Sequence, residues 1–253
     1  MARSAPPDAF GCTAQEYELG RPGWPGELID RVDRRLELER DAVVLDLAAG
    51  TGKLTRVLTP RFRRVIAVEP DRAMRAVLER VVPEAEALAG SAKPLPLDDG
   101  SVDGVFCGEA FHWFFGDDVV AEIARVLGPR GGLVLLWNIP VGELDPPVPD
   151  AAQKLLDDAF ARGGRPGLPI VLSGEWRAPF EESGFEQLHR DEADNEHRVD
   201  RDGLVAHMLS ISSIAALPDE ERRELAESLR ELLPEAVYRR SFRTEAHWTR
   251  LAG

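Results

Sequence analysis

The residues of this chain best suited to bind a ligand are Asp46 and the small residues that follow it. Residues 43–52 read Val-Val-Leu-Asp-Leu-Ala-Ala-Gly-Thr-Gly, and the apolar run is typical of a strand buried on both faces. A buried carboxylate needs partners, so we expect Asp46 to accept hydrogen bonds from amides of the turn that follows. Ala48, Gly50 and Gly52 would let a ligand lie against the backbone, beside the amino terminus of the next helix.

Three kinds of ligand bind at a strand–turn–helix corner, and the residue spacing separates them. A dinucleotide site normally has Gly-x-Gly-x-x-Gly, but the frame Ala48-x-Gly50-x-Gly52 is followed by no third glycine. A phosphate-binding loop ends in Gly-Lys-Ser/Thr, whereas Lys53 precedes Leu54 here. The remaining ligand has a ribose and a base but no phosphate, which describes S-adenosyl-methionine (SAM).

The turn resembles motif I of the class I SAM-dependent methyltransferases, in which an acid is followed by x-Gly-x-Gly-x-Gly. Ala48 stands at the first glycine of that motif. Because alanine avoids the left-handed region, the sequence predicts a negative φ at this position. The resemblance implies that the chain uses SAM as its cofactor.

Glu69 is the acid expected to hold the ribose of that cofactor. It ends the apolar segment 64–69 and lies nineteen residues after Gly50, a spacing at which a carboxylate can accept both ribose hydroxyl protons. Pro70 follows it and is assigned to the same cofactor site. The alternative is an acid that only caps the helix beginning at Pro70 and Asp71.

Residues 89–97 resemble the adenine-binding segment of the same family, in which an acid and the next backbone amide contact the base. Ser91 stands where the family often has aspartate, and Ala92 would supply the amide. A serine hydroxyl can still accept a proton from the exocyclic amine. A plain loop containing two prolines is the alternative.

Residues 108–114 read Gly-Glu-Ala-Phe-His-Trp-Phe and follow the fourth expected strand. Trp113 has the aromatic face that best stabilises a sulfonium cation, although the phenylalanines also suit a plain core. The string resembles Ala-Phe-His-Trp-Phe of small-molecule methyltransferases similar to trans-aconitate methyltransferases, in which it lies over the donor. Glu109 and His112 are therefore the candidate bases, while His112 could instead orient a substrate or be structural.

Tyr17 and Arg21 begin the segment 17–25, Tyr-Glu-Leu-Gly-Arg-Pro-Gly-Trp-Pro. It resembles the lead-in of the same subfamily, Tyr-x-x-x-Arg-Pro-x-Tyr-Pro. The resemblance implies that Tyr17 closes over the donor and that Arg21 pairs with its carboxylate through a bidentate guanidinium. A surface arginine is the alternative.

The elements that must position these residues alternate along the first half of the chain. We expect strands at 43–47, 64–69, 86–90, 101–107 and 132–138, and helices at 26–40, 53–59, 70–82 and 119–127, after a turn-rich lead-in at 17–25. This alternation predicts right-handed crossovers and a parallel sheet that binds its ligand at the carboxyl ends of the strands.

The second half is expected to be different. A proline-rich loop at 140–149 precedes helices at 151–161 and 173–182, a strand region at 185–199, two helices within 201–233 and a last strand at 242–251. We predict an α/β fold with a Rossmann-like, doubly wound, mostly parallel seven-stranded sheet and a helical cap inserted before the last strand. One domain would cover 1–253, with a lead-in at 1–40, a core at about 41–138 and a substrate cap at about 140–183 and 200–235.

Composition restricts the partners. The chain of 253 residues carries a net charge of −14, which disfavours nucleic acid as a ligand. No stretch approaches the ~20 apolar residues of a membrane span and no signal peptide is visible, so we expect a cytoplasmic protein. Cys12 and Cys107 form no disulfide framework, and His189 and His197 lack the spacing of a metal site. The oligomeric state stays open.

These features favour an enzyme that transfers the methyl group of SAM to a hydroxyl, carboxylate or amine of a small molecule. Because the positive sulfur already activates the donor, the protein would mainly supply alignment and exclude water. A nicotinamide-dependent oxidoreductase or a non-catalytic SAM-binding protein are the alternatives. The sequence does not identify the methyl acceptor.

Overall fold

A seven-stranded sheet forms the centre of the molecule, and the computed structural model describes it within residues 13–163 and 167–252. The strands are β1 (Val43–Leu47), β2 (Arg64–Val68), β3 (Glu86–Leu88), β4 (Val102–Gly108), β5 (Leu127–Asp145), β6 (His189–Val199) and β7 (Tyr238–Arg250). Their order is β3-β2-β1-β4-β5-β7-β6, and only β7 runs antiparallel to its neighbours, β5 and β6. The predicted doubly wound, mostly parallel fold is confirmed.

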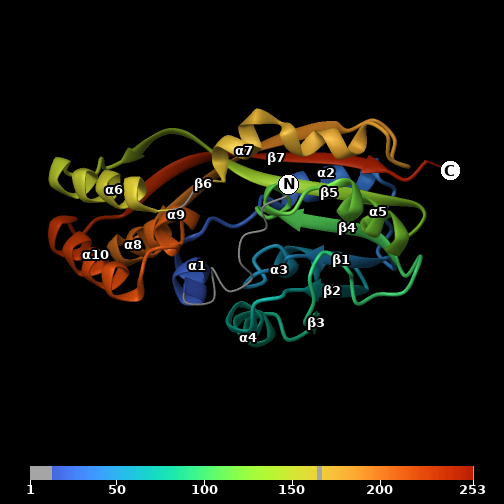
Figure 1. Ribbon diagram of the computed structural model, residues 1–253, viewed down its shortest axis with the longest axis horizontal. Coiled ribbons are helices and arrows are strands. Elements are labelled where there is room, and N and C mark those ends of the chain that lie inside the picture. Colours follow the sequence, from blue (N-terminus) through green and yellow to red (C-terminus); the bar gives the residue numbers. More distant parts are fainter. Residues whose placement is uncertain (1–12, 164–166, 253) are drawn as a thin grey trace.

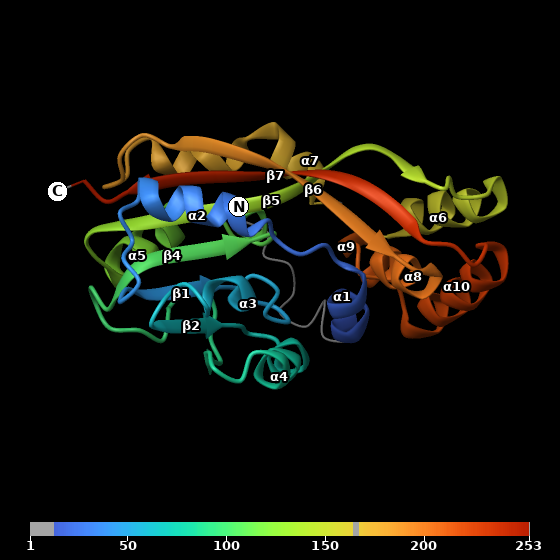
Figure 2. The same cartoon turned by 180° about the vertical axis from the view of Figure 1, so that it is seen from behind.

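The helices form two groups (Figures 1 and 2). Those beside the sheet are α1 (Ala14–Gly20), α2 (Gly26–Arg35), α3 (Thr55–Leu58), α4 (Arg72–Val81), the short η2 (Phe111–Trp113), α5 (Asp117–Val126), α7 (Leu168–Ser173) and η3 (Glu175–Phe180). Those of the cap are α6 (Asp150–Arg162), α8 (Arg201–Leu209), α9 (Ser212–Ala215) and α10 (Asp219–Leu232). The cap lies at the far end of the long strands β6 and β7, next to α1.

Several expectations about local structure are wrong, among them that the last strand begins at 242, since it begins at Tyr238. Residues 14–20 form a helix inside the predicted lead-in, the helix after the first turn begins at Thr55, and 201–233 contains three helices instead of two. The proline-rich segment continues β5 to Asp145, because β7 pairs with it through Pro140 and Val141 and again at Asp145. A long antiparallel partner therefore outweighs the local loop signal of the prolines.

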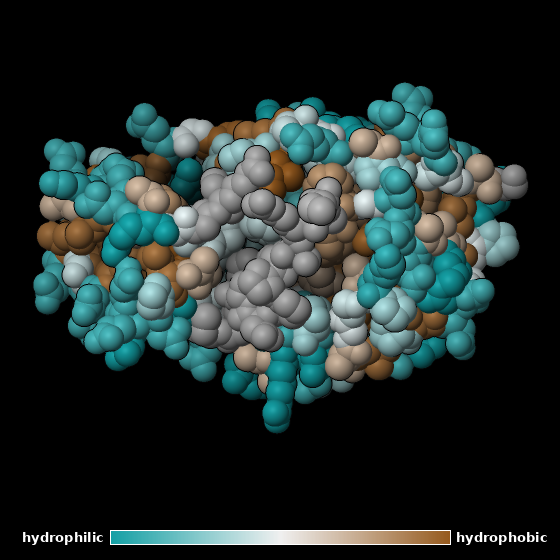
Figure 3. All heavy atoms as spheres, viewed as in Figure 1, coloured by the Kyte–Doolittle hydropathy of each residue, from teal (hydrophilic) through white to brown (hydrophobic). Residues whose placement is uncertain are grey.

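The central strands of the sheet are buried on both faces, as their apolar sequences predicted. Successive residues of β1 point to opposite sides: Leu45 and Leu47 join one apolar cluster, and Val44 joins the other. A third cluster, built around Leu156, Leu204 and Leu229, holds the cap together. Hydrophilic side chains cover much of the face shown in Figure 3, and apolar residues show between them over the cap.

The register of the parallel strands brings three chain turns to one edge. Leu47 of β1 lies opposite Val68 of β2, and Asp46 lies opposite Phe106 of β4. The segments that follow these strands, which contain most of the candidate ligand-binding residues, are therefore neighbours in space. None of the helices in the described part of the chain combines the length and the apolar character needed to cross a membrane.

Helix α1 packs directly against α8 of the cap. At Gly20 a Cβ atom would lie 2.0 Å from the backbone nitrogen of His207, so only glycine allows the two backbones to approach this closely. The last residue of α1 thus fixes the distance between the lead-in and the cap.

We predict that Gly20→Ala destabilises the protein by roughly 1–3 kcal/mol, because the added methyl group must push two backbone segments apart. Urea unfolding measures this change. Gly23→Ala is the matched control, since a Cβ at Gly23 meets nothing within 4 Å. Equal stability of the two variants would contradict the proposed role of Gly20.

Candidate active site

The turn after β1 is left-handed at three positions. The φ values are +57° at Ala48, +58° at Gly50 and +87° at Gly52, so the predicted negative φ of Ala48 is wrong. The amide of Ala49 donates to the Val68 carbonyl at 3.1 Å, and that of Gly52 donates to the Ala49 carbonyl at 2.9 Å. These bonds hold alanine in a conformation that costs it about 1 kcal/mol, which explains why a glycine suits this position better.

The turn leaves room for a ligand on its outer side. A Cβ atom built on Gly50 meets nothing within 4 Å, although the neighbouring elements are densely packed. The backbone at the carboxyl end of β1 therefore borders open space, which is what a cofactor lying against it requires.

Asp46 lies under this turn and is buried. Its Oδ2 accepts a hydrogen bond of 2.6 Å from the hydroxyl of Thr55, whose backbone amide also interacts with it, so its partner among the described residues is the first residue of α3 and not the preceding turn. Its Oδ1 is buried without a partner among the described residues. Burial raises the pKa of this carboxyl to about 7. Asp46 thus keeps one unused acceptor atom next to the cofactor turn.

Glu69 connects the turns that follow β1 and β2. One carboxylate oxygen accepts from the amide of Gly50 and the other from the amide of Asp71, both at 2.8 Å. The helix after Pro70, which is exposed, is capped instead by Asp71, which accepts from Ala73 and Met74. Burial raises the pKa of Glu69 and the two amides oppose that rise. Each oxygen retains a second lone pair that a ribose hydroxyl could use.

Ser91 and Ala92 lie beside the end of β3, next to the same edge. The hydroxyl of Ser91 donates to the carbonyl of Lys93 at 2.9 Å, and the Ser91 side chain is exposed. Ala92 is half-buried against the core. The serine therefore makes a local turn bond and would have to exchange it for a contact with adenine.

Glu109 follows β4 in a left-handed conformation, with φ +56°. Its Oε1 accepts from the backbone amide of Asn138, at 2.7 Å, which anchors the carboxylate to β5. Burial raises the pKa of Glu109, while the charge of Arg21 lowers it. Glu109 is thus a buried, anchored carboxyl with a raised pKa, and a raised pKa makes a carboxylate a better proton acceptor, as a general base requires.

His112 is 5 % exposed and has a fixed tautomer. The indole nitrogen of Trp137 lies 3.0 Å from His112 Nδ1, and because an indole can only donate, Nδ1 must accept. The proton of the neutral ring is therefore on Nε2. Burial lowers the pKa of His112 to about 4. A free lone pair is absent from this ring, so its geometry suits a hydrogen-bond donor and not a base.

The ring of Trp113 lies next to that of His112, with centroids 4.7 Å apart. Phe111, in contrast, is fully buried and packs against Phe114, Trp176 and Phe180. The aromatic segment thus divides into a core residue and a pair of rings that border open space.

Tyr17 and Arg21 approach the site from α1. The Arg21 guanidinium lies 5.4 Å from the centre of the Tyr17 ring and donates to the hydroxyl and the carbonyl of Ser210, at 2.9 and 2.8 Å. Glu18 of the same helix accepts from the hydroxyl of Thr51, at 2.7 Å. Burial raises the pKa of Tyr17 to about 12, so its phenol remains a neutral donor. Helix α1 therefore links the cofactor turn to the cap.

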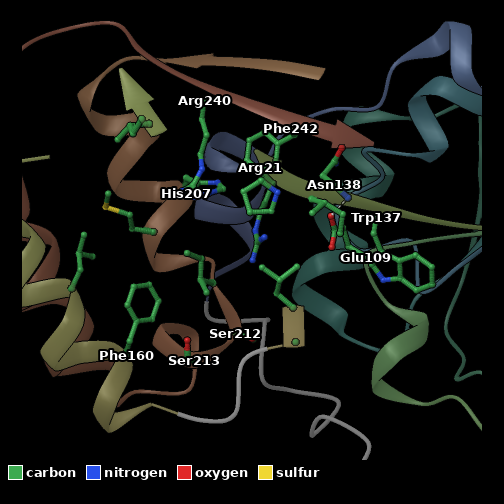
Figure 4. Close-up of a pocket in the computed structure, with 18 of the residues that line it drawn as sticks. Arg21, Glu109, Trp137, Asn138, Phe160, His207, Ser212, Ser213, Arg240 and Phe242 are labelled. Atoms are coloured by element: carbon green, nitrogen blue, oxygen red, sulfur yellow. Dashed lines mark hydrogen bonds between the residues drawn. The ribbon is translucent and has the colours of Figure 1, made fainter. Parts of the chain in front are cut away.

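A cavity of about 810 Å³ lies between the edge of the sheet and the cap (Figure 4). Five of the predicted site residues line it: Tyr17, Arg21, Glu109, His112 and Trp113. The residues of the turn after β1 do not line it, and neither do Glu69, Pro70, Ser91 and Ala92. These residues form the expected cofactor edge, at the carboxyl ends of β1, β2 and β3. That edge and the cavity are therefore adjacent regions that share α1 and the segment after β4.

Several residues of the cavity were not predicted individually, among them His207, Arg240 and Phe242, whereas Ser212 and Ser213 lie in the segment that was expected to cover the substrate side. His207 Nδ1 lies 3.0 Å from the carbonyl of Gly20 and must donate to it, which leaves Nε2 as an acceptor. Arg240 and Phe242 share one face of β7. The side-chain alternation of a strand would have predicted that these two residues face the cavity only if the last strand had been expected to begin at Tyr238 and not at residue 242.

The sheet order and the site at its edge are those of the class I methyltransferase fold. The sequence profile described as a methyltransferase domain matches residues 45–135. An uncharacterised methyltransferase of Schizosaccharomyces pombe is 33% identical over 225 residues, which cover 88% of this chain and 86% of that protein. The chain belongs to the SAM-dependent methyltransferase family, and the family implies SAM as the methyl donor.

Solved structures show the same fold at lower identity. A candidate type II methyltransferase from Anaeromyxobacter dehalogenans has a TM-score of 0.62 at 24% identity, covering 91% of this chain and 98% of its own. The [4+2]-cyclase SpnF has a TM-score of 0.56 at 15% identity, covering 99% and 98%. Since a cyclase shares this fold, the reaction must be argued from the family and the site.

We predict that His112→Gln changes how stability depends on pH. The unfolded chain protonates this histidine near its ordinary pKa of 6.5 and the folded chain only near 4, so its burial costs stability as the pH falls through that interval. Glutamine does not titrate and can accept the indole proton. When the pH falls from about 7 to about 4, the free energy of unfolding should therefore decrease by up to about 3 kcal/mol less in the variant than in the wild type.

Chemical denaturation of both proteins across this pH range measures the difference. Because other buried groups titrate equally in the two proteins, the difference between them isolates His112. Parallel stability curves would show that the ring is not held neutral.

Proposed function

We propose that this protein transfers the methyl group of SAM to a hydroxyl, carboxylate or amine of a small molecule bound between the core and the cap. One observation carries the proposal: the cavity beside the cofactor edge is lined by residues of the core, of α1 and of the cap together. The likeness of residues 108–114 to trans-aconitate methyltransferases supports a small acceptor. We further propose that core and cap act as a single domain, in the cytoplasm.

The cofactor would lie along the strand edge. Its ribose hydroxyls would donate to the free lone pairs of Glu69, and its adenine would contact Ser91 and Ala92. The turn at Gly50 would lie against the cofactor through its backbone. Asp46, with its unpaired oxygen, and Arg21 would hold the charged amino-acid end, with Tyr17 closing over it. Bound SAM supplies an electrophilic methyl group on a positively charged sulfur, and Trp113 offers an aromatic face to such a cation.

The residues of the cavity would then prepare the acceptor. Glu109 can take the proton of a hydroxyl or amine as the new bond forms, whereas a carboxylate acceptor would need no base. His112 donates from Nε2 and so can orient an acceptor oxygen without removing its proton. The mainly apolar walls would limit the water that competes for these contacts once the ligands are bound.

The first test uses ligand-induced stabilisation. SAM and its demethylated product should raise the melting temperature of the wild type, and NAD should not, because a ligand stabilises only a fold that binds it. Absence of any shift with both SAM compounds would refute the proposal. A shift with NAD alone would favour the oxidoreductase instead.

We predict that Glu69→Gln weakens binding of the demethylated product by about tenfold or more, since a charged acceptor of two ribose protons is lost. Calorimetric titration measures the affinity, and urea unfolding shows whether the variant is folded. Glu86→Gln is the control, because Glu86 lies at the exposed edge strand β3. Unchanged affinity of a folded Glu69→Gln protein would exclude the ribose role.

A further inference from the structure

Arg240 is a cationic side chain in the cavity without a counter-charge. Its guanidinium carbon lies 5.9 Å from the ring centre of Phe242, and in the described part of the chain it forms no hydrogen bond or ion pair. Its Nε is among the buried atoms that lack a partner. Burial lowers the pKa of Arg240, so the environment itself disfavours the charge. A half-buried guanidinium with all its donors free is costly unless a ligand supplies the acceptors.

The surroundings of Arg240 reinforce this conclusion. Figure 4 shows the side chain extending from β7 toward His207 and Arg21, while Glu109 lies on the other side of the cavity. His207 is held neutral by its burial, and Arg21 binds Ser210, which offers only neutral oxygens. Of the acidic side chains that line the cavity, Glu109 is anchored by Asn138 and Glu143 is exposed. In a chain of net charge −14, this cavity therefore has a positive pole.

Arg240, the positive pole of the cavity, lies away from the Glu109 end, where the methyl group would be transferred. Arg240, Phe242 and Thr244 alternate on one face of β7, and Thr244 donates to Asn138, the residue whose amide binds Glu109. Four residues of strand place the backbone of Arg240 about 13 Å from this end. Phe242 lies between Arg240 and Thr244 on β7, and the apolar side chains of Met208, Leu204 and Phe160 also line the cavity.

We propose that the methyl acceptor is an amphipathic acid whose carboxylate pairs with Arg240, whose apolar body lies along Phe242, and whose nucleophilic atom reaches the Glu109 end. This inference rests on the proposed function and adds the substrate class. A planar guanidinium binds a carboxylate through two parallel hydrogen bonds, which gives it both affinity and orientation. The acceptor is thus selected at the cap, away from the reacting atom.

The test compares carboxylates with neutral molecules of the same shape. Straight-chain and aryl-alkyl carboxylates, such as decanoate, and the corresponding carboxamides are titrated into the complex of the wild type with the demethylated product. We expect at least one carboxylate to bind at least about tenfold more tightly than the corresponding amide. We expect Arg240→Gln to abolish that preference. Arg240→Lys should restore part of it.

Arg239→Gln is the matched control, because Arg239 is the exposed neighbour on the opposite face of β7, and it should retain the preference. Affinity of each variant for the demethylated product shows that it is folded. Equal binding of carboxylates and amides, or no binding of any carboxylate, would overturn the inference while the proposed function stands. It would also be overturned if Arg240→Gln mainly weakened the demethylated product, since Arg240 would then serve the cofactor. If the wild type does not bind that product, the proposed function itself fails.

Discussion

The parallel register of β1 with β2 and β4 is the constraint on which the rest of the site depends. It places the turn after β1 between the ends of the other two strands, so that Glu69 can bind the amide of Gly50. A slip of one residue would reverse the direction of every side chain and bury Asp46 elsewhere. A slipped register would also separate Asp46 from Thr55 and Glu69 from Gly50, so these polar contacts depend on the same pairing.

Helix α1 joins this edge to the cap. Glu18 of α1 binds Thr51 of the turn, and Arg21, the residue that follows α1, binds Ser210 of the cap. The close approach at Gly20 fixes how near the two parts can come. A displacement of the turn after β1 would therefore also shift the cap, and a displacement of the cap would shift the turn.

The site contains buried ionisable groups whose protonation is set by their neighbours. Trp137 determines which nitrogen of His112 is protonated, and the carbonyl of Gly20 determines the opposite tautomer in His207. Burial raises the pKa of Glu109 against the opposing effect of the Arg21 charge. His112, His207 and Glu109 thus present a donor, an acceptor and a carboxyl to the same cavity, and Arg240 adds a cation that has no partner among the described residues.

The sequence by itself determined the strands of the core, their parallel arrangement and the ligand-binding turn, because each depends on local apolar runs and on small residues at fixed spacing. It also singled out Glu109 and His112, which lie next to a strand end. Tertiary structure decided the rest. The left-handed backbone of Ala48 is held by neighbouring strands, the length of β5 depends on β7, and the partners of His112 and Arg240 come from remote parts of the chain. Contacts between distant segments leave no periodic pattern in a single sequence, so the cavity became visible only when the chain was folded.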